Sequence, residues 1–119
     1  MKKDAIRMIA FDMDGTVLYN GAEITLRLQS LLKKALEQGI YVVPCTGRGR
    51  LQLPATLAAL DLSYTITSNG GRVKDETTGE TIYTNLVDWE MAAGICGDIT
   101  EKDAKVFIDR IGEEGCIVI

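Results

Sequence analysis

The sequence contains no histidine, and this absence removes several kinds of catalytic chemistry. A Ser-His-Asp triad, a Cys-His pair and a His-ligated zinc site all require imidazole, so none of them can be built within this chain. Cysteine is also scarce: Cys45, Cys96 and Cys116 are odd in number and widely spaced, which fits neither a disulfide framework nor a Cys-x-x-Cys zinc site. We interpret them as reduced, mostly buried thiols. Carboxylate chemistry with a hard metal is the class that remains.

Long apolar runs and clusters of basic charge are missing as well. No stretch approaches the roughly 20 apolar residues of a membrane-spanning helix, and no signal-peptide core follows the first residues. The 13 basic residues are scattered and the net charge is −4, which disfavours a nucleic-acid surface. With 46% hydrophobic and 25% charged residues, the 119-residue chain is typical of a soluble globular domain or part of one. We expect a cytoplasmic protein that binds neither membranes nor nucleic acid.

The most informative stretch is an apolar segment that stops at two carboxylates. Residues 6–11 predict a buried strand, and Asp12 and Asp14 follow it, separated by one residue. Gly15 permits a tight turn, so both carboxylates can approach one small volume at the edge of the sheet. Two acids that close repel each other unless a cation or a shared proton lies between them. Oxygen ligands of this kind suit Mg²⁺, which also takes oxygens from a phosphorylated substrate, so Asp12 and Asp14 are the candidate metal ligands.

The same carboxylates support phosphoryl chemistry. One can be a nucleophile that forms an acyl-phosphate, and the other a general acid and then a general base. An ordinary Asp-Gly turn after a strand is the alternative. The string Phe-Asp-Met-Asp-Gly-Thr-Val at residues 11–17 resembles the first motif of the haloacid dehalogenase (HAD) superfamily. The resemblance implies that Asp12 is the nucleophile and Asp14 the acid/base.

A helix and a second strand follow this motif. Residues 24–38 predict a helix because apolar residues recur at three- and four-residue spacing, and Gly39 stands where helices commonly end. Residues 40–43 predict a strand, so the order strand, helix, strand implies a right-handed parallel crossover. The expected apolar stripe of the helix consists of Leu28, Leu31, Leu32, Ala35 and Leu36.

The second strand ends in the polar segment Thr46-Gly47-Arg48. In an open parallel sheet the site lies beyond the carboxyl ends of the strands, so this segment and the two carboxylates should meet. A hydroxyl, glycine N–H groups and a guanidinium can hold phosphate oxygens. Thr-Gly-Arg alone is also an ordinary loop, but after Asp12 it is similar to the second motif of the Cof-type sugar-phosphatase branch. The resemblance implies that Thr46 binds the transferring phosphoryl group, and we assign Gly47 and Arg48 to phosphate binding with it.

The segments after Arg48 continue the alternation of helices and strands. Residues 51–60 predict a short helix with Pro54 in its first turn, and residues 64–67 predict a third strand. That strand ends at Asn69-Gly70, a common turn dipeptide that also resembles an element of Cof-type proteins near the phosphate. The resemblance implies that Asn69 and Gly70 contact the substrate. Residues 72–74 and 81–83 predict a hairpin.

The pattern changes beyond residue 85. We expect helices at residues 87–95 and 103–114 and a strand at residues 116–119. By resemblance, residues 1–85 are the N-terminal part of a HAD core, and residues 86–119 begin an α/β cap that is truncated here. Family members are longer and carry a third-motif lysine and fourth-motif acids after the cap. The resemblance therefore covers nearly all of this chain but only the first part of the family's length.

Residues 97–103 contain candidate replacements for the missing acids. Asp98 and Asp103 could ligate the metal, but no β-rich run precedes them, so we interpret them as loop and helix N-terminal acids. Lys74 and Lys102 could imitate the third-motif lysine, although lysines near a hairpin or a helix start are usually solvated. We expect weak or absent activity when those later groups are lacking.

The sequence thus predicts an α/β fold, a Rossmann-like HAD core with three parallel strands, incomplete, plus the start of a cap. The resemblance implies a Mg²⁺-dependent phosphatase that acts on a small phosphorylated metabolite of the sugar-phosphate class through an aspartyl-phosphate. A phosphomannomutase-like phosphotransferase fits the same motifs, and so does a catalytically silent fragment that binds phosphate or a partner. The first strand would keep one unpaired edge, so we expect self-association through it.

Overall fold

The computed structural model describes residues 5–18 and 20–85, residues 90, 91 and 94, and the strands at 107–111 and 114–118. The chain divides into two compact units, Met1–Thr84 and Asn85–Ile119. The first unit combines helices with a five-stranded sheet, which confirms the predicted α/β class. That the second unit belongs to a cap stays a prediction. In the described part of the chain, no helix has the length and hydrophobicity needed to cross a bilayer.

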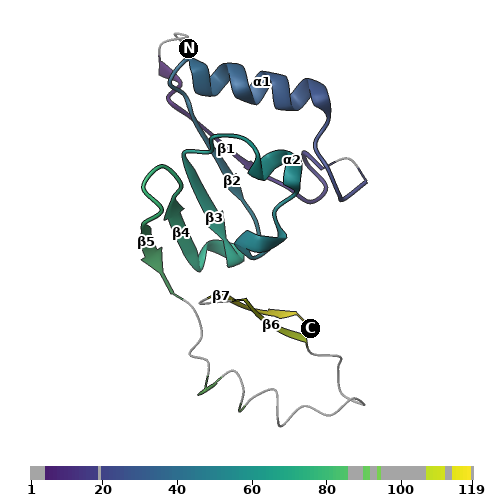
Figure 1. Cartoon of the computed structure of the whole chain (residues 1–119), viewed down its shortest axis with the longest axis vertical. Helices are drawn as coiled ribbons and strands as arrows, with labels where there is room; N and C mark the ends of the chain where they lie inside the picture. Colours follow the sequence, from purple (N-terminus) through teal and green to yellow (C-terminus); the bar gives the residue numbers. More distant parts are fainter. Residues whose placement is uncertain are drawn as a thin grey trace. The chain divides into compact units, whose positions relative to one another are not determined.

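The five-stranded sheet of the first unit has its strands in sequence order from β1 to β5 (Figure 1). The strands are β1 (Met8–Asp12), β2 (Tyr41–Cys45), β3 (Tyr64–Thr67), β4 (Arg72–Asp75) and β5 (Thr81–Thr84). β1, β2 and β3 pair in parallel, as predicted, and the predicted hairpin β4–β5 joins the same sheet because β4 pairs antiparallel with β3. The carboxyl ends of the three parallel strands therefore share one edge, where Asp12 is paired with Cys45.

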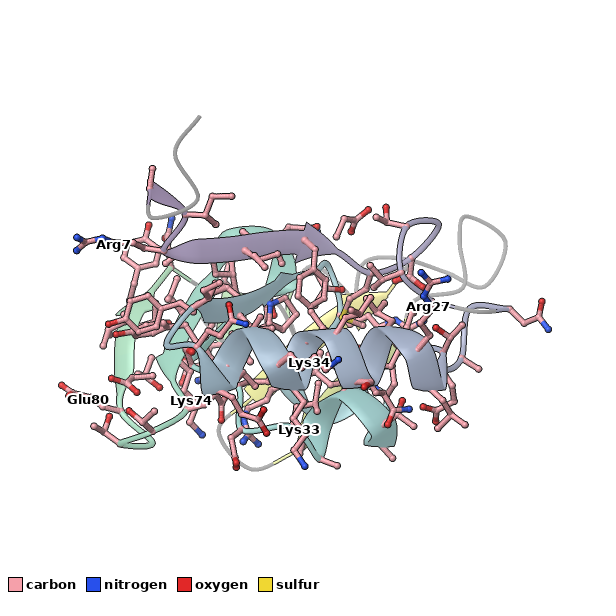
Figure 2. The ribbon with its side chains drawn as sticks, turned by 90° about the horizontal axis from the view of Figure 1, so that it is seen from above. Arg7, Arg27, Lys33, Lys34, Lys74 and Glu80 are labelled. Carbon is pink, nitrogen blue, oxygen red and sulfur yellow. The ribbon has the colours of Figure 1, made fainter. Side chains whose placement is uncertain are left out.

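The helix α1 (Leu26–Glu37) joins β1 to β2. It begins after Thr25, whose side chain accepts a hydrogen bond from the N–H of Leu28, and it ends before Gly39, whose φ of 75° suits a glycine. Leu28, Leu32, Ala35 and Leu36 pack against the core, as predicted. Leu31 does not, because its position places it on the exposed side of the helix. The basic residues Arg27, Lys33 and Lys34 are exposed as well (Figure 2).

The buried core lies around β2. Its members come from the turn after β1, from α1 and the residue two positions before it, from β2, and from the segment between β2 and β3. β2 is buried on both faces because it is central among the parallel strands. The cluster consists of Met13, Ile24, Leu32, Val42, Leu57 and Leu62.

The first strand is not buried, which corrects the prediction made from its apolar sequence. Met8 is 51% exposed and Ile9 36% exposed. β1 is at one end of the strand order, and within the described residues β2 is its sole partner. Within the described residues, the outer edge of β1 is therefore unpaired, as expected.

The segment between β2 and β3 forms two short turns of helix rather than the single helix predicted at residues 51–60. These are η2 (Arg50–Gln52), a 3₁₀ turn, and α2 (Ala55–Ala58). Pro54 separates them, because it holds the preceding Leu53 in an extended conformation with ψ of 138° and then serves as the N-cap of α2.

The second unit contains β6 (Phe107–Ile111) and β7 (Glu114–Val118), which pair antiparallel. The helix predicted at residues 103–114 is therefore wrong over residues 107–111. The backbone of residues 107–111 is instead extended and pairs with residues 114–118, as in Ile108 with Ile117. The strand predicted at the end of the chain is confirmed and begins earlier. The helix predicted at residues 87–95 lies mostly outside the described residues, although Glu90, Met91 and Gly94 are helical.

Candidate active site

A tight turn at the end of β1 presents the two predicted carboxylates. Met13, between them, is fully buried, and its carbonyl accepts hydrogen bonds from the N–H groups of Thr16, Val17 and Leu18 at 3.1–3.2 Å. Gly15 has a φ of 76°, which the turn requires. Met13 is turned into the core while Asp12 and Asp14 on either side of it are exposed, so both carboxylates face outward. Met13 is thus a structural anchor of the site that the sequence pattern did not single out.

Asp12 is held by its own turn. Its Oδ1 accepts a hydrogen bond from the N–H of Met13 at 2.8 Å, and its Oδ2 accepts one from the hydroxyl of Thr16 at 3.3 Å. The residue is exposed. The two contacts fix the direction of the carboxylate and leave lone pairs on both oxygens for a further ligand.

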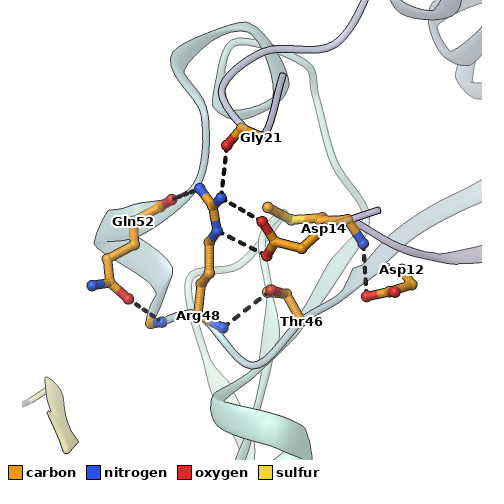
Figure 3. A network of polar contacts seen from close by, with 8 residues as sticks. Asp12, Asp14, Gly21, Thr46, Arg48 and Gln52 are labelled. Atoms are coloured by element: carbon orange, nitrogen blue, oxygen red, sulfur yellow. Dashed lines mark hydrogen bonds and ion pairs between the residues drawn. The ribbon is translucent and has the colours of Figure 1, made fainter. Parts of the chain in front are cut away.

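Asp14 forms a two-point ion pair with Arg48 (Figure 3). Nε of Arg48 donates to Oδ2 at 3.0 Å, and Nη2 donates to Oδ1 at 2.6 Å. The same guanidinium donates to the carbonyls of Gly21 at 2.9 Å and Gln52 at 3.3 Å. Hydrogen bonding from Arg48 lowers the pKa of Asp14, and the carboxylate in turn raises the pKa of Arg48. Arg48, which is predicted to bind phosphate, thus contacts Asp14, the predicted acid/base. The two residues are too far apart in the sequence for a local motif to reveal this pairing.

The loop after β2 is held by hydrogen bonds among its own residues and to β3. Thr46 is 5% exposed, its N–H donates to the carbonyl of Ile66 at 2.9 Å, and its Oγ1 accepts from the N–H of Arg48 at 3.1 Å. The N–H of Gly49 donates to Oε1 of Gln52 at 3.0 Å. Thr46 and Arg48 are therefore held in one conformation beside the carboxyl end of β1, as Figure 3 shows.

The loop after β3 is attached to the loop after β2. The N–H of Ser68 donates to the carbonyl of Arg48 at 3.0 Å, and the N–H of Asn69 donates to the carbonyl of Thr46 at 3.1 Å. Ser68 and Asn69 both have a positive φ, 53° and 54°, which is an unusual backbone for residues with a Cβ. The side chain of Asn69 fills the space beside Gly47, where a Cβ would lie 2.8 Å from Oδ1 of Asn69. The two predicted segments are thus adjacent.

Cys45 lies beside Asp12 in the pairing of β1 with β2. It is a free, partly buried thiol. Burial raises its pKa, and the charge of Asp12 adds to the effect. The thiol is therefore protonated near neutral pH and is not a competing nucleophile.

The donor set of this site suits a hard cation at Asp12. Mg²⁺ uses one or two carboxylates and completes its shell with waters and substrate phosphate, and the exposed carboxylate of Asp12 meets that need. Both oxygens of Asp14 are engaged by Arg48. Within the described residues, no three His, Cys, Asp or Glu side chains come together as a metal-binding group. Asp98, Lys102 and Asp103 lie outside the described residues, and Lys74 lies in β4, where its charge acts on Glu76.

Comparison with known proteins identifies the family. The model of the haloacid dehalogenase-like hydrolase family matches residues 9–115. Since this match spans most of the chain, the chain belongs to the haloacid dehalogenase-like hydrolases, and the predicted family is confirmed.

The relatives with assigned activities are phosphatases. The 5-amino-6-(5-phospho-D-ribitylamino)uracil phosphatase YwtE of Bacillus subtilis is 34% identical over 98 residues, which are 82% of this chain and 34% of that protein. The HMP-PP phosphatase of Serratia proteamaculans is 37% identical over 105 residues, 87% of this chain and 38% of that protein. A haloacid dehalogenase-like hydrolase from Bacteroides thetaiotaomicron matches in structure with a TM-score of 0.67 at 26% identity, over 77% of this chain and 36% of that one. The chain spans about a third of the length of the curated relatives it matches.

Proposed function

We propose that this chain carries the nucleophile and the acid/base of a Mg²⁺-dependent phosphatase for a small phosphorylated metabolite. The observation that carries the proposal is the convergence of Asp12, the Asp14–Arg48 pair and Thr46 at one edge of the parallel strands. A carboxylate with free lone pairs, an ionised acid and a hydroxyl beside backbone N–H groups are the parts that phosphoryl transfer to an aspartate needs.

In this proposal Asp12 attacks phosphorus. Its carboxylate is ready to do so because it is exposed and its direction is fixed by Met13 and Thr16. Mg²⁺, when bound by Asp12, supplies charge neutralisation for the phosphoryl oxygens. Thr46 and Gly47 bind those oxygens through the hydroxyl and the loop N–H groups.

Asp14 then moves the proton. It donates a proton to the leaving oxygen and afterwards accepts one from the water that hydrolyses the aspartyl-phosphate. Because Arg48 lowers the pKa of Asp14, the carboxyl group is ionised while the pair is intact. We infer that Arg48 turns toward the phosphoryl oxygens when substrate binds, which frees Asp14 to take up a proton and gives Arg48 its phosphate-binding role.

The substrate class follows from the family and its phosphatase relatives. The relatives YwtE and the HMP-PP phosphatase are named for phosphorylated small molecules, and the aspartyl-phosphate route proposed for Asp12 needs a substrate that carries a phosphoryl group. We extend the class, a small phosphorylated metabolite, to this chain and propose that it acts in the cytoplasm.

The test is phosphate release from a panel of sugar phosphates and p-nitrophenyl phosphate, with and without Mg²⁺. Because the later groups of the family are lacking, we expect any release to be weak, to depend on Mg²⁺ and to be abolished by Asp12→Asn while the variant stays folded by circular dichroism. Ser30→Ala changes an exposed residue of α1 and is the control variant, which should release phosphate as the wild-type chain does. Release that persists in Asp12→Asn would show that this aspartate is not the nucleophile. A folded chain that neither releases nor binds phosphate would contradict the proposal.

A further inference from the structure

A second two-point ion pair joins the loop after β2 to the β4–β5 hairpin. Nε of Arg50 donates to Oε1 of Glu76 at 3.0 Å, and Nη2 donates to Oε2 at 2.8 Å. The hydroxyl of Thr65, in β3, donates to Oε1 at 2.8 Å. The side chain of Glu76 is 12% exposed. Both of its oxygens are therefore bonded, while the side chain of Arg50 is 36% exposed. The two parallel N–H···O contacts fix the orientation of the pair as well as its distance.

Glu76 is itself held in place. Its N–H donates to the carbonyl of Ser63 at 3.0 Å, and it opens a turn in which Asp75 accepts hydrogen bonds from the N–H and the hydroxyl of Thr77 at 2.9 and 2.6 Å. The N–H of Gly79 closes the turn on the carbonyl of Asp75 at 2.8 Å. The backbone of Glu76 is thus held by the sheet and by the turn, through contacts that do not involve Arg50.

Arg50, by contrast, belongs to the segment that carries Thr46 and Arg48. It begins η2, whose last residue, Gln52, accepts from the side chain of Arg48 and from the N–H of Gly49. A shift of Arg50 would therefore move Gln52, and with it the acceptor that helps to hold the guanidinium of Arg48 against Asp14.

We propose that Glu76 and Arg50 are positioning residues that hold the Thr46–Arg48 loop in its phosphate-binding conformation. The inference rests on the proposed function, because it gives that loop the task of binding phosphate. Neither residue touches substrate; each acts through the loop. The fixed turn of the hairpin serves as the reference point, and the ion pair transmits its position to the loop.

The test measures the binding of inorganic phosphate to the folded chain by amide NMR, following the signals of Gly47, Arg48 and Gly49. We expect Glu76→Gln to shift these signals in the absence of phosphate and to raise the apparent dissociation constant by about 2- to 30-fold, the range for residues that act on a site through intermediate contacts. Arg50→Lys keeps the positive charge but loses the two parallel N–H donors of the guanidinium, so it should also shift the loop signals and raise the dissociation constant. Glu80→Gln is the matched control, because it removes the same charge from the exposed end of the hairpin.

Binding is measured well below the melting temperature of each variant, so a loss of global stability alone leaves the affinity of the folded chain unchanged. A double variant that exchanges the charges, Arg50→Glu with Glu76→Arg, should recover part of the affinity. If Glu76→Gln does not fold, Arg50→Lys and the exchange variant decide the question. Wild-type affinity and unshifted loop signals in all three would overturn the positioning role.

A Thr46→Val variant separates this inference from the function it rests on. If phosphate binds to the wild-type chain and Thr46→Val weakens this binding while the Arg50 and Glu76 variants do not, the loop binds phosphate and the positioning role is wrong. If Thr46→Val has no effect, or the wild-type chain binds no phosphate, the proposed function is wrong and the positioning role falls with it.

Discussion

The guanidinium of Arg48 meets both carboxylate oxygens of Asp14, through Nε to Oδ2 at 3.0 Å and Nη2 to Oδ1 at 2.6 Å. The two residues are brought together because β1 and β2 are parallel neighbours whose carboxyl ends share one edge of the sheet. The pair keeps Asp14 ionised, so the protonation of Asp14 depends on where Arg48 points.

The first prediction concerns that dependence. Arg48→Ala removes the hydrogen bonds that lower the pKa of Asp14, so we expect this pKa to rise toward the ordinary aspartate range. Carboxyl ¹³C NMR titration of Asp14 measures it. Arg27→Ala, an exposed arginine of α1, removes the same charge from another place and should leave the titration of Asp14 unchanged. An unchanged pKa in Arg48→Ala would contradict the pairing.

The second prediction concerns the contact between Gly47 and Asn69. Gly47→Ala places a Cβ 2.8 Å from Oδ1 of Asn69, so the end of this exposed side chain must move away from its present rotamer, at a loss of about 0.5–1.5 kcal/mol in the free energy of unfolding. Urea denaturation measures the loss. The matched control is Gly49→Ala in the same loop, because the nearest atom to a Cβ there is 3.8 Å away and its φ of −70° suits alanine. In an Asn69→Gly background the loss from Gly47→Ala should largely disappear, since the clashing atom is gone.

The third prediction concerns acid stability. Hydrogen bonds from Arg50, and then from Thr65, lower the pKa of Glu76 in the folded chain. A carboxyl group with a lowered folded pKa stabilises the fold above its unfolded pKa of about 4.3, and this stabilisation is lost as the pH falls through the folded pKa.

Glu76→Gln should therefore be less stable than wild type near neutral pH, and the difference should shrink as the pH falls below about 4. Urea midpoints measured across this range test the expectation. Asp14 and Asp75 also have lowered pKa values, so wild type and variant both lose stability in acid, and the difference between the two curves is the quantity to compare. A difference that does not depend on pH would mean that Glu76 acts through its shape and not its charge.

The fourth prediction concerns the start of α1. Thr25→Ala removes the hydroxyl that accepts from the N–H of Leu28, and we expect the free energy of unfolding to fall by about 1 kcal/mol. Thermal or urea denaturation measures the change. Ser30→Ala, in the exposed middle of the same helix, should be neutral or slightly stabilising because alanine has the higher helix propensity. Equal effects of the two substitutions would contradict the capping role.

The fifth prediction concerns the exposed edge of β1. We propose that copies of the chain associate through it, because a strand with exposed Met8 and Ile9 whose outer edge is unpaired in the described residues favours further strand pairing. Sedimentation should show concentration-dependent association, and Met8→Lys should reduce it by placing a charge on the edge. Ile82→Lys makes the same change in β5, at the other end of the described strand order, and should leave the association unchanged. A monomer at all concentrations would rule out this role of the edge.

The local features of the sequence determined much of the fold. A helix with a 3.6-residue apolar stripe, three short apolar strands and a hairpin with turn residues are visible in the order of side chains alone, because each depends on neighbours within a few positions. The rule that parallel strands present their carboxyl ends at one edge also predicted that residues 12–14 and 46–48 meet, and the family resemblance added residues 69–70 to them.

Tertiary structure decided the rest. β1 carries an apolar sequence and is nevertheless exposed, because burial depends on a second neighbour and not on composition. Residues 107–111 have helical spacing and form a strand, because their backbone pairs with residues 114–118, and apolar spacing along the chain does not reveal such a pairing. The ion pairs of Arg48 with Asp14 and of Arg50 with Glu76 join residues 34 and 26 positions apart. Such pairs depend on which strands become neighbours, so the sequence supplied the charged groups and only the folded sheet decided their partners.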